Sequence, residues 1–218
     1  FVLLWSTGFI GAKYGLPYAE PLTFLAVRYV LVIGLMTLLA LAMRAPWPAS
    51  PRDAMHIAVT GLLVHAVYLG GVFMSIHHGL PAGISALVVG MQPLLTGALA
   101  GALLGERVSS RQWAGLALGF AGVALVVGSK VSVDGVATDA LGRMLLPALA
   151  ALVGITAGTL YQKRFCPRFD LRTGSVLQFL PSLALTALVA SQIETMQIDW
   201  SGEFVFALLW LVLVLSLG

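Results

Sequence analysis

The sequence predicts an all-α integral membrane protein, a bundle of helices that crosses the bilayer many times. Of its 218 residues, 59% are hydrophobic and only 10% are charged, and the mean hydropathy is +0.97. From Ala54 to Gly105 the chain contains no Asp, Glu, Lys or Arg, and only the turn-like segment His77–Pro81 interrupts the apolar run. Because a membrane-spanning helix needs about 20 mostly apolar residues, this stretch is long enough for two spans joined by a tight turn.

Charges, prolines and glycines divide the whole chain in the same way, into eight expected spans. These spans lie near residues 1–16, 21–43, 54–76, 81–104, 111–128, 144–162, 173–192 and 204–218. The connections are short, so we expect no aqueous domain with its own core. Phe1 starts inside an apolar run, with no initiator Met and no charged flank before it, and Gly218 stops inside another run, which predicts a fragment cut within a helix at both ends. The single cysteine, Cys166, excludes an internal disulfide and a thiolate metal cluster, and we predict no metal and no cofactor.

Loop charges predict the orientation. Taking alternate loops, one set carries eight basic residues: Arg44, Arg52, Arg107, Arg111, Lys163, Arg164, Arg168 and Arg172. The opposite set carries three: Lys13, Lys130 and Arg143. The basic set lies in the loops after the second, fourth and sixth spans, and basic loops stay in the cytoplasm. The chain therefore also begins on the cytoplasmic side. The same rule accounts for the net charge of +3, so we expect no nucleic-acid partner.

The chain also aligns with itself at an offset of 150 residues. The matched pairs are Gly8 and Gly158, Lys13 and Lys163, Pro17 and Pro167, Glu20 and Asp170, Thr23 and Thr173, and Arg28 and Gln178. Five helices make one repeat, and since five is odd, the second copy must enter the membrane upside down. We expect a first repeat over 1–128, an extracytoplasmic connecting loop over 129–143, and an incomplete second repeat of about three helices over 144–218. Inverted repeats are typical of secondary transporters, whose binding site lies near the midplane between the copies.

Particular segments then carry a family resemblance. The strongest runs from Gly79-Leu80-Pro81-Ala82-Gly83 through Gln92-Pro93-Leu94-Leu95 to Leu104-Gly105-Glu106-Arg107 and Trp113-Ala114-Gly115. This block, with Leu4-Trp5-Ser6 near the start, resembles an EamA-type transporter of the drug/metabolite transporter superfamily. The resemblance implies ten helices in two inverted five-helix repeats, with both termini cytoplasmic. It also implies a multi-pass protein of the cytoplasmic (inner) membrane of a bacterium that carries small organic solutes.

Two spans contain polar residues at a depth where polarity is costly. Arg28 lies about seven residues into the second span, and a charge there must be paired, hydrated or facing a cavity. The alternative is a side chain that reaches the outer surface, near Glu20. Gln92 and Pro93 lie midway along the fourth span, where the proline opens the helix and the glutamine offers a donor and an acceptor. We expect Gln92 to face the cavity, and a simple kink with an interhelical hydrogen bond is the alternative.

His65 and Tyr68 lie three residues apart on one face of the third span. A histidine titrates near neutrality and could couple solute movement to protons, or it could be a packed neutral residue. The remaining substrate-path candidates are Trp5, Ser6, Tyr161 and Gln178. His56, His77 and His78 are expected to be interfacial residues.

The predicted function is a secondary transporter or exporter of small organic metabolites, amino-acid-like or amphiphilic, working by alternating access. An intramembrane enzyme is the first alternative, and the spans contain no motif of a serine hydrolase or zinc protease. A channel or a structural helix bundle is the other alternative, without a visible selectivity filter. The predicted partners are a small-molecule substrate and the lipid bilayer, and a second copy of the chain in a homodimer is a further alternative. No Asp or Glu lies inside any expected span.

Overall fold

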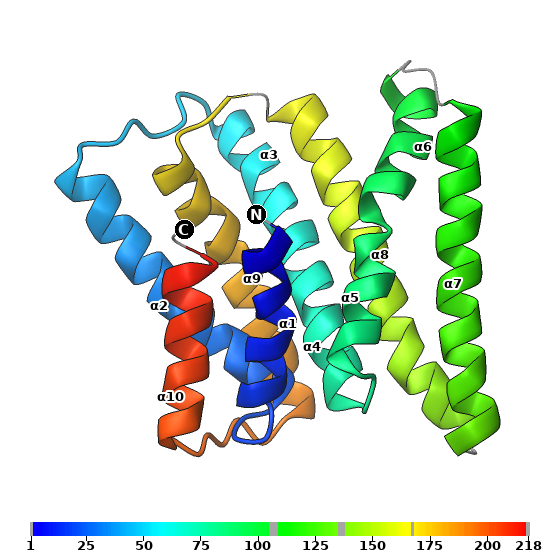
Figure 1. Cartoon of the computed structure of the whole chain (residues 1–218). Helices are drawn as coiled ribbons and strands as arrows, with labels where there is room; N and C mark the ends of the chain where they lie inside the picture. Colours follow the sequence, from blue (N-terminus) through cyan, green and yellow to red (C-terminus); the bar gives the residue numbers. More distant parts are fainter. Residues whose placement is uncertain (1, 105–108, 135–137, 167, 217–218) are drawn as a thin grey trace.

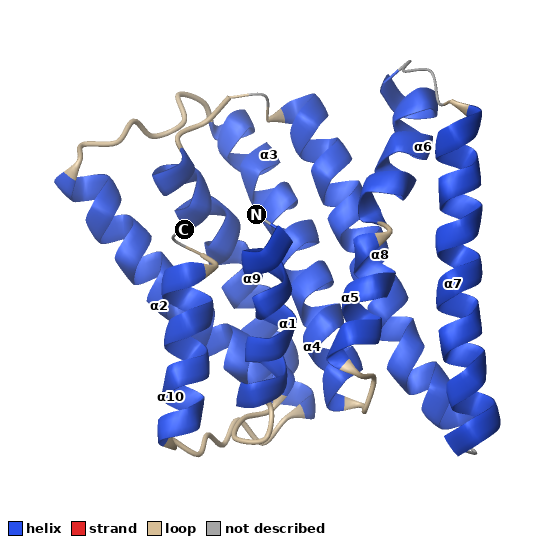
Figure 2. Cartoon of the chain, viewed as in Figure 1, coloured by secondary structure: helices blue, strands red, loops and turns tan. Residues whose placement is uncertain are grey.

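The computed structural model describes residues 2–104, 109–134, 138–166 and 168–216, and these are almost entirely helical (Figures 1 and 2). The α-helices are α1 (Val2–Gly15), α2 (Pro21–Ala42), α3 (Pro51–Gly61), α4 (Gly70–His77), α5 (Ala82–Gly90), α6 (Gln92–Leu104), α7 (Ser110–Asp134), α8 (Thr138–Phe165), α9 (Leu171–Ile193) and α10 (Gly202–Leu209). Two π-helices interrupt this pattern, η1 (Leu62–Leu69) and η2 (Trp210–Val214).

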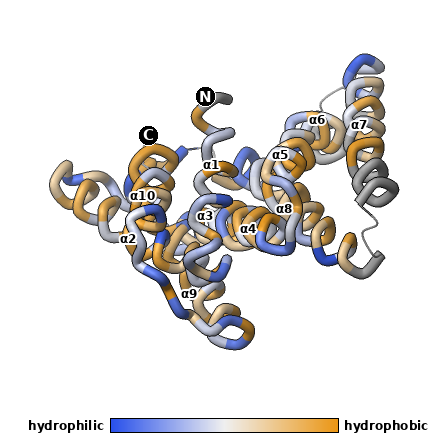
Figure 3. The backbone as a smooth tube through the Cα atoms, turned by 60° about the horizontal axis from the view of Figure 1, so that its bottom comes forward, coloured by the Kyte–Doolittle hydropathy of each residue, from blue (hydrophilic) through white to orange (hydrophobic). Residues whose placement is uncertain are grey.

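Helices lie in each of the eight segments that were predicted as spans. α3, η1 and α4 follow one another as the third span, α5 and α6 make the fourth, and α10 with η2 makes the eighth. Within the described residues, five segments are long and apolar enough to cross a bilayer, namely 21–42, 51–77, 82–99, 140–165 and 171–193. The hydropathy-coloured tube is orange along most helices and bluest near their ends (Figure 3). The protein is therefore a multi-pass membrane protein.

The connection between α7 and α8 differs from the prediction. Residues 129–143 were expected to form a loop, but α7 continues to Asp134 and α8 starts at Thr138. Residues 135–137 lie outside the described part of the chain. Glycine and isolated charges in this segment led to the loop prediction, yet a helix tolerates both where it emerges from the apolar layer.

The loop charges separate onto two ends of the bundle. In Figure 1 the α2–α3 and α8–α9 connections lie at the upper end, and the α1–α2, α4–α5 and α9–α10 connections lie at the lower end. The upper end carries most of the basic residues, so we call it the basic end; Arg107 lies outside the described residues. The lower end carries Glu20, Glu194, Asp199 and Glu203, and we call it the acidic end.

The segments predicted as the two repeats pack against each other through corresponding helices. α1 descends and α8 ascends in Figure 1, so the two repeat-leading helices run in opposite directions. A Cβ added to Gly8 of α1 would meet Leu215 after η2 at 3.1 Å, and one added to Gly158 of α8 would meet Val64 of η1 at 2.6 Å. In each case the first helix of one repeat lies against the third helix of the other. α2 and α9, the second helices of the two repeats, form the most extensive pairing.

Proline interrupts the fourth span as predicted. α5 ends at Gly90 and α6 begins at Gln92, with Met91 in a turn between them. Pro93 is the second residue of α6, where its missing N–H needs no partner in the preceding helix.

The closest helix contacts are made at glycines of the third span. An added Cβ at Gly97 of α6, or at Gly115 or Gly119 of α7, would meet its neighbour at an ordinary 3.5–3.6 Å. By contrast, a Cβ on Gly61 would lie 2.2 Å from the backbone oxygen of Gln178, and one on Gly71 would lie 2.4 Å from that of Pro147. The tight helix contacts therefore join the two repeats and not α6 to α7.

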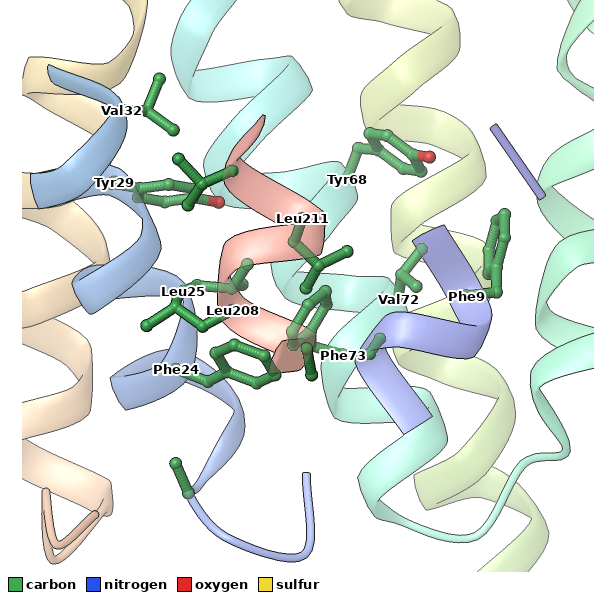
Figure 4. Packing of buried hydrophobic residues seen from close by; sticks show 14 of the residues in the cluster. Phe9, Phe24, Leu25, Tyr29, Val32, Tyr68, Val72, Phe73, Leu208 and Leu211 are labelled. Atoms are coloured by element: carbon green, nitrogen blue, oxygen red, sulfur yellow. The ribbon is translucent and has the colours of Figure 1, made fainter. Parts of the chain in front are cut away.

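A core of aromatic and aliphatic side chains closes the space between the repeats toward the acidic end (Figure 4). Phe24 of α2 packs against Phe73 of α4, with ring centroids 5.3 Å apart, and against Phe204 of α10, with centroids 5.0 Å apart. These three side chains are at most 2% exposed. We refer to them as the aromatic layer.

Below the aromatic layer, the two repeats are joined by reciprocal carboxylate contacts. The Glu194 carboxylate, just after α9, accepts hydrogen bonds from the backbone N–H groups of Leu22 and Thr23 at 2.8 and 2.7 Å. The Glu20 carboxylate, just before α2, accepts from the backbone N–H and the hydroxyl of Thr195, both at 2.6 Å. These contacts, which we call the outer clasp, hold the Glu20 pKa below its usual value because the Thr195 hydroxyl hydrogen-bonds the ionised carboxylate.

Candidate functional site

A cavity of about 240 Å³ lies between the two repeats, above the aromatic layer. Its walls come from α1, α2, η1, α4, α9 and the end of the chain after η2. It is lined by Trp5, Gly8, Phe9, Arg28, Val64, His65, Tyr68, Leu69, Val72, Phe73, Ser175, Gln178, Phe179, Leu215 and Ser216. Five of the nine predicted substrate-path residues therefore meet here: Trp5, Arg28, His65, Tyr68 and Gln178. We call this space the central cavity.

Arg28 carries the charge of the central cavity. Its side chain is 5% exposed, and its Nη2 donates a hydrogen bond to the Ser216 hydroxyl at 3.0 Å. Its buried Nε has no hydrogen-bond partner among the described residues. The side chain does not reach the outer surface beside Glu20, because it is buried and bound to Ser216, while the Glu20 carboxylate binds Thr195. The surface-reaching alternative for Arg28 is therefore wrong, and the guanidinium faces the cavity.

His65 lies beside Arg28 in the cavity wall and is held in place on two sides. Its ring stacks on Phe179, with centroids 3.8 Å apart and planes at 18°. Its Nε2 lies 3.3 Å from Gln178 Oε1. With the amide placed this way, Nε2–H donates, and the buried Nδ1, which has no partner within the described part of the chain, presents a lone pair.

Irregular backbone positions the residues of the third span. His65 and Tyr68 belong to the π-helix η1, where the wider turns shift side chains and leave carbonyls less well paired. The Tyr29 hydroxyl donates a 2.7 Å hydrogen bond to the His65 carbonyl and satisfies one of them. The eighth span contains the second π-helix, η2, followed by Ser216, whose hydroxyl donates to the Leu211 carbonyl at 3.0 Å. At the offset of 150 residues, η2 matches residues 60–64, which are the end of α3 and the first three residues of η1.

The central cavity is closed toward the acidic end and reaches toward the basic end. Phe73 of the aromatic layer forms part of its floor. At the other end its wall includes Ser175, which lies in the first turn of α9 at the basic end. Tyr68, Val72 and Phe73 line this cavity, and Tyr68 lies above the other two in Figure 4.

Ser6 belongs to a different space. A second cavity of about 570 Å³ lies between α1, α5, α6 and α7, and Trp5 lines both cavities. Its walls are mostly small and apolar, with Gly83, Gly90 and Gly119 among them. Trp5 packs edge-on against Phe9, with ring centroids 5.2 Å apart, and separates the two spaces.

The expectation that Gln92 faces the central cavity is wrong in this structure. Its Nε2 donates to Thr96 at 2.9 Å, one turn further along α6, and to Thr159 of α8 at 3.3 Å. The helix break before Pro93 turns the amide toward α8, so the interhelical hydrogen bond is the alternative that the structure supports. Tyr161 also lies outside the central cavity. Its hydroxyl is 2.7 Å from His56 Nδ1.

Several cavity residues were missed by reasoning from the sequence. The missed lining residues include Ser175, Phe179 and Ser216. Each is a serine or an aromatic residue in an apolar run, which is ordinary in membrane helices. Tyr29 does not line the cavity, but it binds the His65 carbonyl and was missed as well. The repeat register offered one signal, because Ser216 matches Ala66, the neighbour of His65. Tyr29 was signalled only by its place next to Arg28.

Comparison with known proteins agrees with this architecture. Residues 1–128 match the EamA-like transporter family. An uncharacterized transporter, YvbV, of Bacillus subtilis is 28% identical over 100% of this chain and 70% of its own length. A probable amino-acid metabolite efflux pump of Escherichia coli K12 is 26% identical over 95% of this chain and 65% of its own length. The inner membrane transporter YedA of the same strain, also uncharacterized, is 27% identical over 88% of this chain.

A solved crystal structure has the same fold. It superposes on 100% of this chain and 71% of its own with a TM-score of 0.67, at 22% sequence identity. The chain spans 59–70% of the length of the three relatives named above.

Proposed function

Because the chain belongs to the EamA-like transporter family, we propose that it moves small organic metabolites across the cytoplasmic membrane as a secondary transporter. Membership in a transporter family excludes the intramembrane-enzyme alternative. The alternative of a non-transporting channel or structural bundle is addressed by the flux experiment below.

One observation carries this proposal: a solute-sized cavity lined by helices of both segments that we interpret as inverted repeats. Transporters of this architecture place their substrate site near the midplane between the repeats. The central cavity has that location, and its wall combines Arg28, His65 and Gln178 with aromatic surface. Ligand sites typically pair an apolar lining with a few placed polar groups.

Alternating access is supported by the difference between the two ends of the cavity. At the acidic end, the aromatic layer and the outer clasp join the repeats and block the path. At the basic end, the cavity reaches Ser175 in the first turn of α9. A transport cycle would break the outer clasp and close the basic end, so that the two repeats rock about the central site.

The direction and orientation are also part of the proposal. The basic end faces the cytoplasm because basic loops are retained there, which places the amino end inside. A cavity that reaches the basic end would then load from the cytoplasm. This suits export, and one relative is named as a probable efflux pump for amino-acid metabolites.

The experiment is flux from proteoliposomes that contain the full-length protein. Proteoliposomes loaded with a mixture of labelled metabolites should release at least one of them faster than liposomes that carry the same mixture but no protein. The rate of release should saturate at high internal concentration. A variant in which α2 and α9 are crosslinked across the outer clasp, through cysteines at Thr23 and Glu194 with Cys166 replaced, should lose that release and regain it on reduction. Release that never saturates would indicate a channel, and no release of any metabolite would overturn the proposal.

A further inference from the structure

Two buried polar atoms in the wall of the central cavity have no hydrogen-bond partner among the residues that the structure describes. They are Nε of Arg28, a donor on a cation, and Nδ1 of His65, an acceptor in the tautomer that Gln178 favours. Buried polar groups in proteins are almost always hydrogen-bonded, and an unpaired one indicates a missing partner. In the apolar layer of a membrane this cost is larger, because lipid cannot supply the partner.

The charge of the lining selects the sign of that partner. Arg28 is the charged residue of the lining, and no Asp or Glu is among the described residues that form it. Ser216, the neutral partner of Nη2, does not neutralise the guanidinium. A cation in an apolar surrounding attracts an anion strongly, and a guanidinium matches the planar geometry of a carboxylate.

The rest of the wall selects the body of the ligand. Trp5, Phe9 and Tyr68 offer aromatic surface, and Val64, Leu69 and Val72 add aliphatic surface. The volume of about 240 Å³ is near the lower limit of ordinary ligand pockets, which start at about 300 Å³. A long chain or a fused ring system would not fit without movement of the walls.

We propose that the central cavity binds a monoanionic carboxylic acid with a single apolar or aromatic group, such as an arylalkanoic or 2-hydroxy acid. The carboxylate binds Arg28 Nε, a hydroxyl or other donor on the ligand binds His65 Nδ1, and the apolar group contacts Trp5 and Tyr68. This inference rests on the proposed transport function and names its substrate class. A zwitterion is disfavoured because its ammonium group would lie near Arg28 without a carboxylate in the wall.

The test is isothermal titration calorimetry on the full-length protein in phosphatidylcholine nanodiscs, at pH 7. The probes are 3-phenyllactate, 3-phenylpropionate, the neutral 3-phenylpropionamide and phenylalanine. We expect 3-phenyllactate to bind most tightly and the amide to bind at least about tenfold more weakly than its acid, because the neutral amide cannot form an ion pair with the guanidinium. The amide binding within twofold of the acid, or phenylalanine binding more tightly than 3-phenyllactate, would overturn the inference.

Variants test whether Arg28 is the residue that makes the cavity prefer an acid to its amide. Arg28→Met should abolish the preference for acid over amide, and Arg28→Lys should retain part of it. Arg52→Met, which removes an exposed cation at the start of α3, should leave it unchanged. If Arg28→Met does not fold, the acid–amide comparison on the unmodified protein still decides, because it needs no variant.

An anionic lipid headgroup could present the same chemistry as a free acid. Repeating the titration in phosphatidylglycerol nanodiscs separates the two sources. Unchanged affinity supports a free solute, and loss of all binding would mean that lipid occupies the cavity, which overturns the inference. Saturable flux without selectivity for acids would leave the transport proposal standing while removing this one.

Discussion

Gly61 is the point at which α3 comes closest to α9, and its replacement by alanine tests how the central cavity is held together. A Cβ on Gly61 would lie 2.2 Å from the backbone oxygen of Gln178 and 2.4 Å from its Cα. Real Cβ atoms essentially never come within 3.0 Å of another heavy atom, so α9 would have to withdraw by roughly 1 Å. Both contacts are backbone atoms, and therefore no change of rotamer relieves the overlap.

The size of the effect follows from two opposing contributions. Overpacking of this kind costs about 1–3 kcal/mol, whereas alanine in place of glycine within a helix gains up to about 1 kcal/mol. We expect Gly61→Ala to lower the free energy of unfolding by about 1–2 kcal/mol. The withdrawal of α9 would also lengthen the 3.3 Å contact between His65 and Gln178 and release the histidine ring.

The assay is unfolding in a sodium dodecyl sulfate titration, followed by far-ultraviolet circular dichroism, with calorimetry of 3-phenyllactate binding on the same samples. Gly34→Ala is the matched control, because no atom lies within 4 Å of its added Cβ and only helix propensity changes. We expect Gly61→Ala to unfold earlier and bind more weakly than Gly34→Ala. Equal stability and equal binding for the two variants would refute the close approach of α3 and α9.

Four further predictions concern other parts of the chain. Glu194→Ala should lower the free energy of unfolding by about 1 kcal/mol, because the N-terminus of α2 loses its cap; Gln192→Ala, an exposed neighbour, should change little in the same titration. Asp170 caps α9 and binds Arg172, and the Arg172 hydrogen bond lowers the pKa of Asp170 from 3.8 to about 2. The stability that Asp170 contributes is complete above its ordinary pKa and is lost as the pH falls toward 2, and melting curves of Asp170→Asn should lack this acid-dependent loss. Tyr29→Phe should cost about 1–3 kcal/mol, because the His65 carbonyl in η1 loses its 2.7 Å donor, and a stability equal to that of the unmodified protein would contradict this role. A cysteine at Arg168, with Cys166 replaced, should resist a membrane-impermeant thiol reagent in intact cells, and labelling from outside would reverse the proposed orientation.

The sequence by itself determined the features that depend on one segment and its solvent. Apolar length, separated by charges and turns, predicts each membrane span, because every stretch of about 20 residues must satisfy the bilayer on its own. The interruption before Pro93 is equally local. Arg28, His65 and Tyr68 were found because a charge or a titratable ring inside a span is costly unless it faces a cavity or a partner.

Only the tertiary structure decided the features that join segments far apart in the chain. The direction of the Gln92 amide depended on Thr159, sixty-seven residues away, and the outer clasp joins residues more than 170 positions apart. The important glycines were Gly61 and Gly71, since a close approach is set by the backbone of another helix and not by spacing within one. The π-helices were also beyond prediction, because the free energy of an extra residue in a turn depends on what its carbonyls and side chains meet across the bundle.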